Sequence, residues 1–377
     1  PNFLDITANG GNVAFQTNQS AARLSTNNSV TSTAVHQTKL YHQYMPGKSQ
    51  LIKTTINFYA NVTNVTKRTG YFDANNGIYF EQTGDGILSL CIRTDTGGTI
   101  SDARKVSQSD WNIDKCDGTG SSKFILDITK TQIFWIDFQW LGVGRVRCGF
   151  VNNGKYVTAH EFYNSNYLST VYMSNPNLPV RCEIFNTGTT TGGYFDQICS
   201  TVISEGGYRE VGQDWGVSNP SMRVLAANTI LPILAIRLKN TFGGYQFNRM
   251  QVKLETINVF STGENIKYRI VKLPNDGYLT GGSWSSVNTN SGVEYNATAT
   301  LFTDGEELGN GYVAASQQNQ QKAVATTSNG TSGSQSKKNF IVQNYTSTNS
   351  EIYLISAENI GTASTNVGVG LQWREIY

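Results

Sequence analysis

Four aromatic residues in or near predicted loops of the first half of the chain could contact a sugar. They are Trp111, Tyr163, Tyr167 and Tyr172. Exposed indole and phenol rings stack on the apolar faces of saccharides, so this set predicts a glycan-contact site. The alternative is that these rings fill a core, which is the usual place of aromatic residues in a β-sandwich.

The three histidines, His36, His42 and His160, give no sign of a nucleophilic active site. Such a site needs a base within hydrogen-bond reach of the nucleophile, and the chain has no Gly-x-Ser-x-Gly elbow or comparable Cys/His signature. His160 lies within a predicted strand, where we expect a half-buried strand residue. The sequence therefore predicts no catalytic residues and a protein that is not an enzyme.

A polysaccharide hydrolase is the enzymatic alternative, because a glycosidase needs two carboxyl groups that face one cleft. The candidate pairs are Asp137 with Glu161, and Glu81 with Glu183. The chain has 27 acidic residues, so pairs of this kind arise easily. Nothing in the spacing of either pair makes its two members converge.

The cysteines predict neither a zinc site nor a disulfide framework. The chain has five of them, Cys91, Cys116, Cys148, Cys182 and Cys199, and no Cys-x-x-Cys pair. A zinc site requires paired ligands at short spacing. Because Cys91, Cys148 and Cys182 lie in apolar strand runs, we expect reduced, buried thiols and assembly in a reducing cytoplasm.

The run Asp73-Ala74-Asn75-Asn76-Gly77 resembles a calcium-binding loop, but its glycine stands in the fifth place and no full set of oxygen ligands follows. A hairpin turn explains this run better, since Asn-Gly is a strong turn signal. No Gly-rich phosphate-binding loop is present. We therefore expect no metal and no cofactor.

Composition and charge argue against two classes of partner. The formal net charge is +2, from 29 Lys and Arg against 27 Asp and Glu, without a concentrated basic surface, so nucleic acid is not expected as a partner. No apolar stretch approaches the roughly 20 residues of a membrane-spanning helix, and we expect no membrane insertion. Residues 1–17 lack the basic start and apolar core of a signal peptide.

The elements that must position these side chains are strands. Between Gln132 and Phe150, apolar residues alternate with other residues over two adjacent runs joined by glycines, and a period of two marks half-buried strands. The residues expected to face inward are Phe134, Ile136, Phe138, Trp140, Val146, Cys148 and Phe150. The chain also has 19 Tyr, 17 Phe and only 15% charged residues, which is typical of many short strands linked by polar turns.

Residues 41–213 are predicted to form an antiparallel β-sandwich, a jelly roll of the lectin-like kind. Two Asn-Gly pairs, Asn76-Gly77 and Asn153-Gly154, separate apolar runs and predict hairpins. Other predicted strands include Leu51–Tyr59, Ile87–Arg93, Phe124–Ile128, Tyr156–Phe162 and Val180–Phe185. Strands at this spacing, without a helix between them, indicate a sandwich.

The rest of the chain is divided between an arm and a second domain. Residues 1–40 are polar with sparse apolar positions, and we expect an extended N-terminal arm that either packs on a neighbouring subunit or is poorly ordered. Residues 214–377 are predicted to form a second β-sandwich, in which Leu234, Ile236 and Leu238 face inward. The Ser/Thr/Gly-rich stretch 326–334 is expected to be a flexible loop of that domain.

Several motifs of residues 41–213 resemble a module of virion structural proteins, found in tailed bacteriophages, especially marine and cyanobacterial ones, and in large DNA viruses. The motifs are YFDANNGIYFE (71–81), QSDWNIDK (108–115), LDITKTQIF (126–134), WLGVGRVRCGF (140–150), YMSNPNLP (172–179) and ICSTVISEGGY (198–208). The second domain is similar, more weakly, to segments that follow this module in the same viral proteins.

The resemblance implies a non-enzymatic structural protein of a virus particle, assembled in the host cytoplasm. It would be a capsid decoration protein or head fibre, or a tail-fibre or baseplate component, that acts through subunit contacts. The implied partners are other virion proteins of the capsid or tail and further copies of this chain, with a homotrimer as the expected oligomer. The alternative is a receptor-recognition module on the virion surface that binds host glycans.

Overall fold

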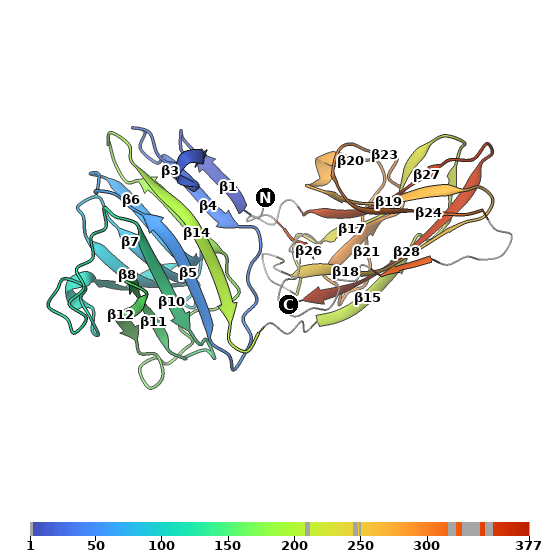
Figure 1. Cartoon of the computed structure of the whole chain (residues 1–377). Helices are drawn as coiled ribbons and strands as arrows, with labels where there is room; N and C mark the ends of the chain where they lie inside the picture. The colour runs from blue at the N-terminus through green and yellow to red at the C-terminus, as the bar shows by residue number, and fades with distance from the viewer. Residues whose placement is uncertain are drawn as a thin grey trace. The chain divides into compact units, whose positions relative to one another are not determined.

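A computed structural model of the chain describes residues 3–207, 212–243, 248, 250–315, 322–325, 340–343 and 350–376. They divide into two compact units, Pro1–Arg209 and Glu210–Tyr377, which Figure 1 shows from blue to red along the chain. The paired strands of both units are antiparallel, which confirms the predicted all-β fold. None of the helices in the described residues is long and apolar enough to cross a membrane.

Two seven-stranded sheets form the first unit. Sheet A has the order β1 (Phe3–Ala8), β4 (Thr33–Thr38), β13 (Val180–Asn186), β6 (Val65–Phe72), β7 (Gly77–Gln82), β8 (Leu88–Thr94) and β9 (Ser101–Ser107). Sheet B has the order β12 (Lys155–Phe162), β11 (Val146–Asn152), β10 (Gln132–Phe138), β5 (Gln50–Asn57), β14 (Tyr194–Ser204), β3 (Ala21–Ser25) and β2 (Asn12–Gln16). Alternate side chains of both sheets meet in one shared core.

The core of the first unit is built around aromatic rings. The Phe80 ring of β7 lies 5.4 Å from that of Phe134 on β10 and 5.1 Å from that of Phe150 on β11, measured between centroids. Tilted and edge-on ring pairs at these separations stabilise a core beyond the area they bury. The predicted inward positions of β10 and β11 are confirmed as buried, and Trp140 is partly buried.

Trp135 points to the other face of sheet B, yet it is buried as well. Its indole lies against Gly149 of the neighbouring strand, where an added Cβ would stand 2.9 Å from a Trp135 ring carbon. The Trp135 Nε1–H donates to the carbonyl of Phe150 at 3.1 Å. The same Cβ would stand 2.0 Å from the Val157 carbonyl oxygen of β12, so a glycine at 149 is needed by the neighbouring backbone as well as by the ring.

Residues 1–40 do not form the expected arm. They supply β1 and β4 to sheet A and β2 and β3 to sheet B, and the three-residue 3-10 helix η1 (Thr17–Gln19) lies between β2 and β3. Although apolar residues are sparse here, Ala21, Leu24 and Ala34 are buried, because neighbouring strands provide the rest of the core. The signal that sequence reasoning overlooked is Asn9-Gly10, whose positive φ angles of 52° and 85° turn the chain from one sheet into the other.

Both predicted hairpin turns are confirmed, and one predicted strand is wrong. Asn153 and Gly154 have φ angles of +49° and +78° and join β11 to β12, as a two-residue hairpin turn requires. Residues 73–76 join β6 to β7, and Gly77 is the first residue of β7, paired with Phe72. Residues 124–128 form a loop instead of a strand. Their burial alternates as in a strand, with Ile125 exposed between Phe124 and Leu126, but their only ladder pairing is the isolated bridge of Ile125 with Asp117.

The second unit contains two six-stranded sheets. Sheet C consists of β15 (Gly212–Ser218), β28 (Thr365–Ile376), β18 (Gln251–Ser261) and β25 (Lys322–Ala325), with β16 (Arg223–Leu225) paired to β28 and β26 (Phe340–Ile341) paired to β18. Sheet D has the order β21 (Ser285–Ser286), β22 (Val293–Asn296), β17 (Ile230–Leu238), β27 (Ile352–Asn359), β19 (Ile266–Leu273) and β24 (Glu306–Val313).

The second unit has its own core between sheets C and D. Leu234, Ile236 and Leu238 are fully buried, as predicted. A smaller apolar cluster on sheet D includes Leu273 and Leu354. Side chains from η3 (Asp276–Tyr278), β20 (Leu279–Thr280) and β23 (Leu301–Phe302) pack against it. The loop predicted for 326–334 lies outside the described residues.

Cys91, Cys116, Cys148 and Cys182 are buried, and Cys199 is exposed. Burial raises the pKa of the Cys91 thiol to about 11 and that of Cys182 to about 12. These buried thiols are therefore neutral near pH 7 and pack as small hydrophobic groups, as the strand pattern predicted for Cys91, Cys148 and Cys182.

The buried His160 of β12 should make the stability of the first unit fall at low pH. Its Nδ1 accepts a hydrogen bond from the backbone N–H of Asn112 at 3.2 Å, and burial, helped by the charge of Arg104, lowers its pKa from 6.5 to about 4. As pH falls from 6.5 to 4, the unfolded chain binds a proton that the folded chain excludes. We expect this histidine to cost about 1–2 kcal/mol of unfolding free energy over that range.

The measurement is urea denaturation of the wild type and His160→Gln at pH 7.5, 6.5, 5 and 4. The glutamine amide oxygen can accept the same hydrogen bond but does not titrate. We therefore expect the wild type to lose about 1–2 kcal/mol more stability than His160→Gln between pH 6.5 and 4, and parallel stability curves would contradict this role of His160.

Candidate functional site

Two of the four predicted glycan-contact residues are core residues, which corrects the prediction for them. Trp111 is 2% exposed, and its indole N–H donates to the Val106 carbonyl at 3.2 Å. Tyr172 is 1% exposed, and its hydroxyl donates to the Gln139 carbonyl. Trp111 follows the 3-10 helix η2 (Gln108–Asp110) in a loop that folds back over the core, so its place in a loop did not make it accessible.

The other two residues, Tyr163 and Tyr167, form an exposed aromatic pair. Their side chains are 50% and 75% exposed, and their rings stack with centroids 5.9 Å apart and an interplanar angle of 26°. Both follow β12, at the start of the segment that leads to β13. We call these two residues the tyrosine pair. Of the four predicted positions, only these two are accessible to a ligand.

Asn164 fixes the backbone that carries the tyrosine pair. It is 2% exposed, although both tyrosines beside it in the turn are open to solvent. Its Oδ1 accepts from Arg104 Nη1 at 2.6 Å, and its Nδ2 donates to the Gly144 carbonyl at 2.5 Å. Arg104 also donates to the Tyr163 carbonyl at 3.2 Å. The turn is therefore bound to β9 on one side and to the β10–β11 connection on the other.

The turn itself is closed by its own backbone. The N–H groups of Tyr167 and Leu168 both donate to the Asn164 carbonyl, at 3.1 and 3.0 Å. Leu168 packs against the core of the first unit. The tyrosine pair is thus presented by a turn with both ends fixed, which lowers the conformational entropy that a ligand would have to remove.

Two other exposed tyrosines differ from the tyrosine pair, because a cation of the chain already covers each ring. Lys53 Nζ lies 5.1 Å from the Tyr156 centroid, and the Arg23 guanidinium lies 4.5 Å from the Tyr194 centroid. In the described part of the chain no cation lies over Tyr163 or Tyr167. Sequence reasoning did not single out Tyr156 or Tyr194, and nothing in their spacing marks their exposure.

The carboxylate pair Glu81 and Glu183 is brought together, but by an arginine. Arg68 Nε donates to Glu81 at 2.6 Å, and Arg68 Nη1 donates to Glu183 at 2.9 Å. Both carboxylate side chains are buried, with 1% and 8% exposure. Although burial opposes ionisation, Arg181 and Arg68 hold the pKa of Glu183 below its usual value. A carboxyl group that acts as a general acid needs a raised pKa instead.

The second carboxylate pair, Asp137 and Glu161, is separated by one strand. Arg147 lies between them in register, opposite Asp137 on β10 and opposite Glu161 on β12. Asp137 accepts hydrogen bonds from Arg147 and Arg145. Arg145 and Arg147 therefore form ion pairs with Asp137 on the sheet.

The run Asp73–Gly77 forms a turn whose aspartate is already bonded. Asp73 Oδ1 accepts from the backbone N–H groups of Asn75 and Asn76 at 2.8 and 2.9 Å. Over the described residues, no group of three or more His, Cys, Asp or Glu side chains is arranged to hold a metal ion.

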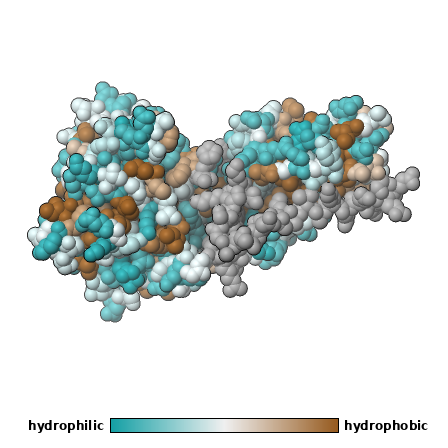
Figure 2. Space-filling model, viewed as in Figure 1, coloured by the Kyte–Doolittle hydropathy of each residue, from teal (hydrophilic) through white to brown (hydrophobic). Residues whose placement is uncertain are grey.

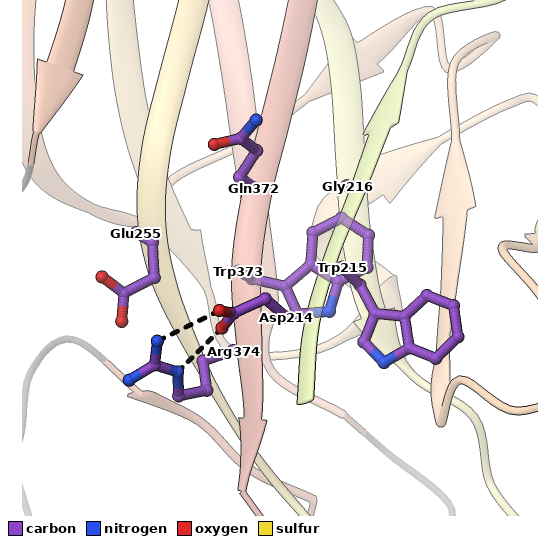
Figure 3. A pocket seen from close by; sticks show the side chains of 7 residues that line it. All are labelled: Asp214, Trp215, Gly216, Glu255, Gln372, Trp373 and Arg374. Atoms are coloured by element: carbon purple, nitrogen blue, oxygen red, sulfur yellow. Dashed lines mark hydrogen bonds and ion pairs between the residues drawn. The ribbon is translucent and has the colours of Figure 1, made fainter. Parts of the chain in front are cut away.

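A groove of about 530 Å³ lies on the second unit, where sequence reasoning placed no site (Figure 3). Its lining residues are Asp214, Trp215, Gly216, Glu255, Gln372, Trp373 and Arg374. The alternation of polar and apolar residues along β15 and β28 could have indicated a polar outer face here.

Figure 2 shows the hydrophobic residues of the visible face in separate small patches, so no large apolar surface dominates that face.

No family model matches the chain, and no curated protein matches it. Solved structures that it resembles include a legume lectin-like domain from Entamoeba histolytica, at 9% identity and a TM-score of 0.31 over 54% of this chain and 89% of that one. A carbohydrate-binding module from Bacillus subtilis matches at 11% identity and a TM-score of 0.25, over 50% and 91% of the two chains. The alginate lyase AlyC3 matches at 7% identity and a TM-score of 0.30, over 51% and 78%. These likenesses concern the fold alone.

Replacing Asn164 with Ala should destabilise the turn that carries the tyrosine pair. The change leaves Arg104 Nη1 and the Gly144 carbonyl without their partner, which costs about 1–3 kcal/mol for buried polar groups. We expect lower stability in urea and faster amide hydrogen exchange in residues 163–171. Ser165→Ala is the matched control, because Ser165 lies in the same turn and is exposed. Equal exchange rates in the two variants would show that Asn164 does not fix the turn.

Proposed function

We propose that the first unit binds glycans and that the tyrosine pair, Tyr163 and Tyr167, is its contact surface. The observation that supports this is an exposed, uncovered pair of stacked rings on a turn with fixed ends. Tyrosine suits such contacts, since it offers a large ring of low side-chain entropy together with a hydroxyl that can bond a sugar. The proposed activity is glycan binding without catalysis.

The turn gives the tyrosine pair a fixed geometry before a ligand arrives. Asn164 and Arg104 hold the backbone of Tyr163, and Leu168 anchors the far side of the turn. A loop that is already ordered loses less entropy on binding than a mobile one. The outer face of each ring is then available for the apolar face of a pyranose.

We also propose, from the resemblance of the motifs in residues 41–213 to a viral module, that the chain is a non-enzymatic component of a virus particle. It would act as a capsid decoration or head fibre, or in a tail fibre or baseplate, as a homo-oligomer in contact with other virion proteins. A glycan-binding first unit on the surface of such a particle would serve host recognition.

Alanine substitution of the tyrosine pair should abolish glycan binding by the first unit without unfolding the chain. We expect Tyr163→Ala and Tyr167→Ala each to weaken binding about tenfold, which corresponds to about 1.4 kcal/mol, and the double variant to bind no glycan through the first unit. The measurement is a glycan array with the purified chain, followed by calorimetry on the saccharides that bind.

Two controls separate loss of contact from loss of structure. Tyr156→Ala removes an equally exposed tyrosine whose ring is covered by Lys53, and it should bind like the wild type. The double Tyr→Phe variant keeps both rings and should retain most of the affinity. A double alanine variant with unchanged binding would rule out the tyrosine pair as the site.

Counting copies of the chain in purified virus particles tests the second proposal. Quantitative mass spectrometry against the major capsid protein should give hundreds of copies for a decoration protein. A small multiple of three or six would instead indicate a fibre or baseplate component. Absence of the chain from the particles would contradict a virion role.

A further inference from the structure

The groove of the second unit lies on the outer face of sheet C. Figure 3 shows the side chains of Asp214, Glu255 and Arg374 on one side of the strands, with Trp215 and Trp373 on the opposite side. Trp373 is fully buried, and its Nε1–H donates to Glu375. The groove therefore has a polar, solvent-facing surface, and the two tryptophans below it belong to the core side of the sheet.

A glycine opens the groove at its centre. Gly216 of β15 lies opposite Gln372 of β28, and it leaves the outer face of β15 without a side chain beside Asp214. A Cβ built there would lie 3.3 Å from the Leu371 carbonyl and 3.4 Å from Gln372 Cγ, so a side chain would fit after a small adjustment and would project into the groove. Glycine in a strand interior is unfavourable unless something approaches the backbone closely.

The polar groups around this opening include both donors and acceptors. Arg374 holds Asp214 through Nε at 2.7 Å and Nη2 at 3.1 Å, which orients the carboxylate. Glu255 lies 3.8 Å from Lys253 Nζ, measured at Oε1. Lys253 does not line the groove, but it lies opposite Arg374 on the neighbouring strand. With Lys253 counted, the two acids and two bases give no net charge, and the Gln372 amide adds a neutral donor and acceptor.

We propose that this groove binds a neutral oligosaccharide. A nucleic acid would need an excess of positive charge, which the balanced Asp214, Glu255, Lys253 and Arg374 do not provide. Vicinal hydroxyls match carboxylate acceptors, and ring and hydroxyl oxygens match guanidinium and amide donors. The volume of about 530 Å³ lies within the range of about 300–1,000 Å³ that is typical of ligand pockets.

This site is independent of the proposed function, because it lies on the other unit and shares no residue with the tyrosine pair. The test uses the full chain in two backgrounds, the wild type and the double variant Tyr163→Ala/Tyr167→Ala. The probes are maltohexaose, cellohexaose, chitohexaose, mannohexaose and xylohexaose as neutral ligands, with tetragalacturonic acid as the charged comparison. Binding and stoichiometry are measured by calorimetry.

Gly216→Val is the informative variant, because it fills the groove with a residue that favours strands. Gly309→Val makes the same change on β24 of sheet D, away from the groove, and serves as the matched control. Gln372→Ala is a second groove variant that adds no bulk. We expect Gly216→Val and Gln372→Ala to weaken a neutral hexasaccharide at least tenfold in the double tyrosine background, with no change in Gly309→Val.

Each outcome separates the two sites. Residual binding in the double tyrosine variant that is lost with Gly216→Val supports the groove. Binding that does not depend on the tyrosines but is weakened by Gly216→Val supports the groove and contradicts the proposed function. Binding that neither Gly216→Val nor Gln372→Ala weakens overturns the groove. Complete loss of binding in the double tyrosine variant overturns the groove. Preference for tetragalacturonic acid, or no binding of the wild type to any of the probes, also overturns it.

Discussion

The first unit depends on one packing constraint, which is that two seven-stranded sheets must meet through a layer of aromatic rings. Phe80 from sheet A contacts Phe134 and Phe150 from sheet B, and Trp111 closes the layer from a loop. Rings of this size bury large areas and tolerate few geometries. The spacing of the sheets follows from this layer, and so does the course of the loops that fold over it, including the segment that carries the tyrosine pair.

The outer face of sheet A is stabilised differently, by charges and rings that cover each other. Arg68 bonds Glu81 and Glu183, and its guanidinium lies 5.0 Å from the Tyr79 ring centroid. Arg93 approaches the same ring at 5.3 Å while it pairs with Asp102. Ion pairs of this kind offset their desolvation only when each group is fully bonded. The ion pairs of Arg68 and Arg93 hold these side chains in place, and the sequence alone gives no sign of this pairing.

The two candidate sites use the strands in different ways. The tyrosine pair stands on a turn beyond the end of a strand, where a rigid scaffold can present side chains without giving up its own packing. The groove of the second unit lies on the strands themselves, where a glycine and a paired Asp214 and Arg374 shape the outer face of sheet C. One surface offers apolar ring faces and the other offers hydrogen-bonding groups, so the two suit different features of a saccharide.

The sequence by itself determined the strand class, the inward positions of β10, β11 and β17, and the two Asn-Gly hairpins, because period-two burial and left-handed turn residues are local properties. It did not determine that β1 to β4 complete both sheets, since their pairing partners β13 and β14 lie far along the chain. Only the tertiary structure separated buried Trp111 and Tyr172 from exposed Tyr163 and Tyr167, and only it placed Arg68 between two acids. Exposure and charge pairing depend on which distant residues cover a side chain, and a single sequence does not encode that locally.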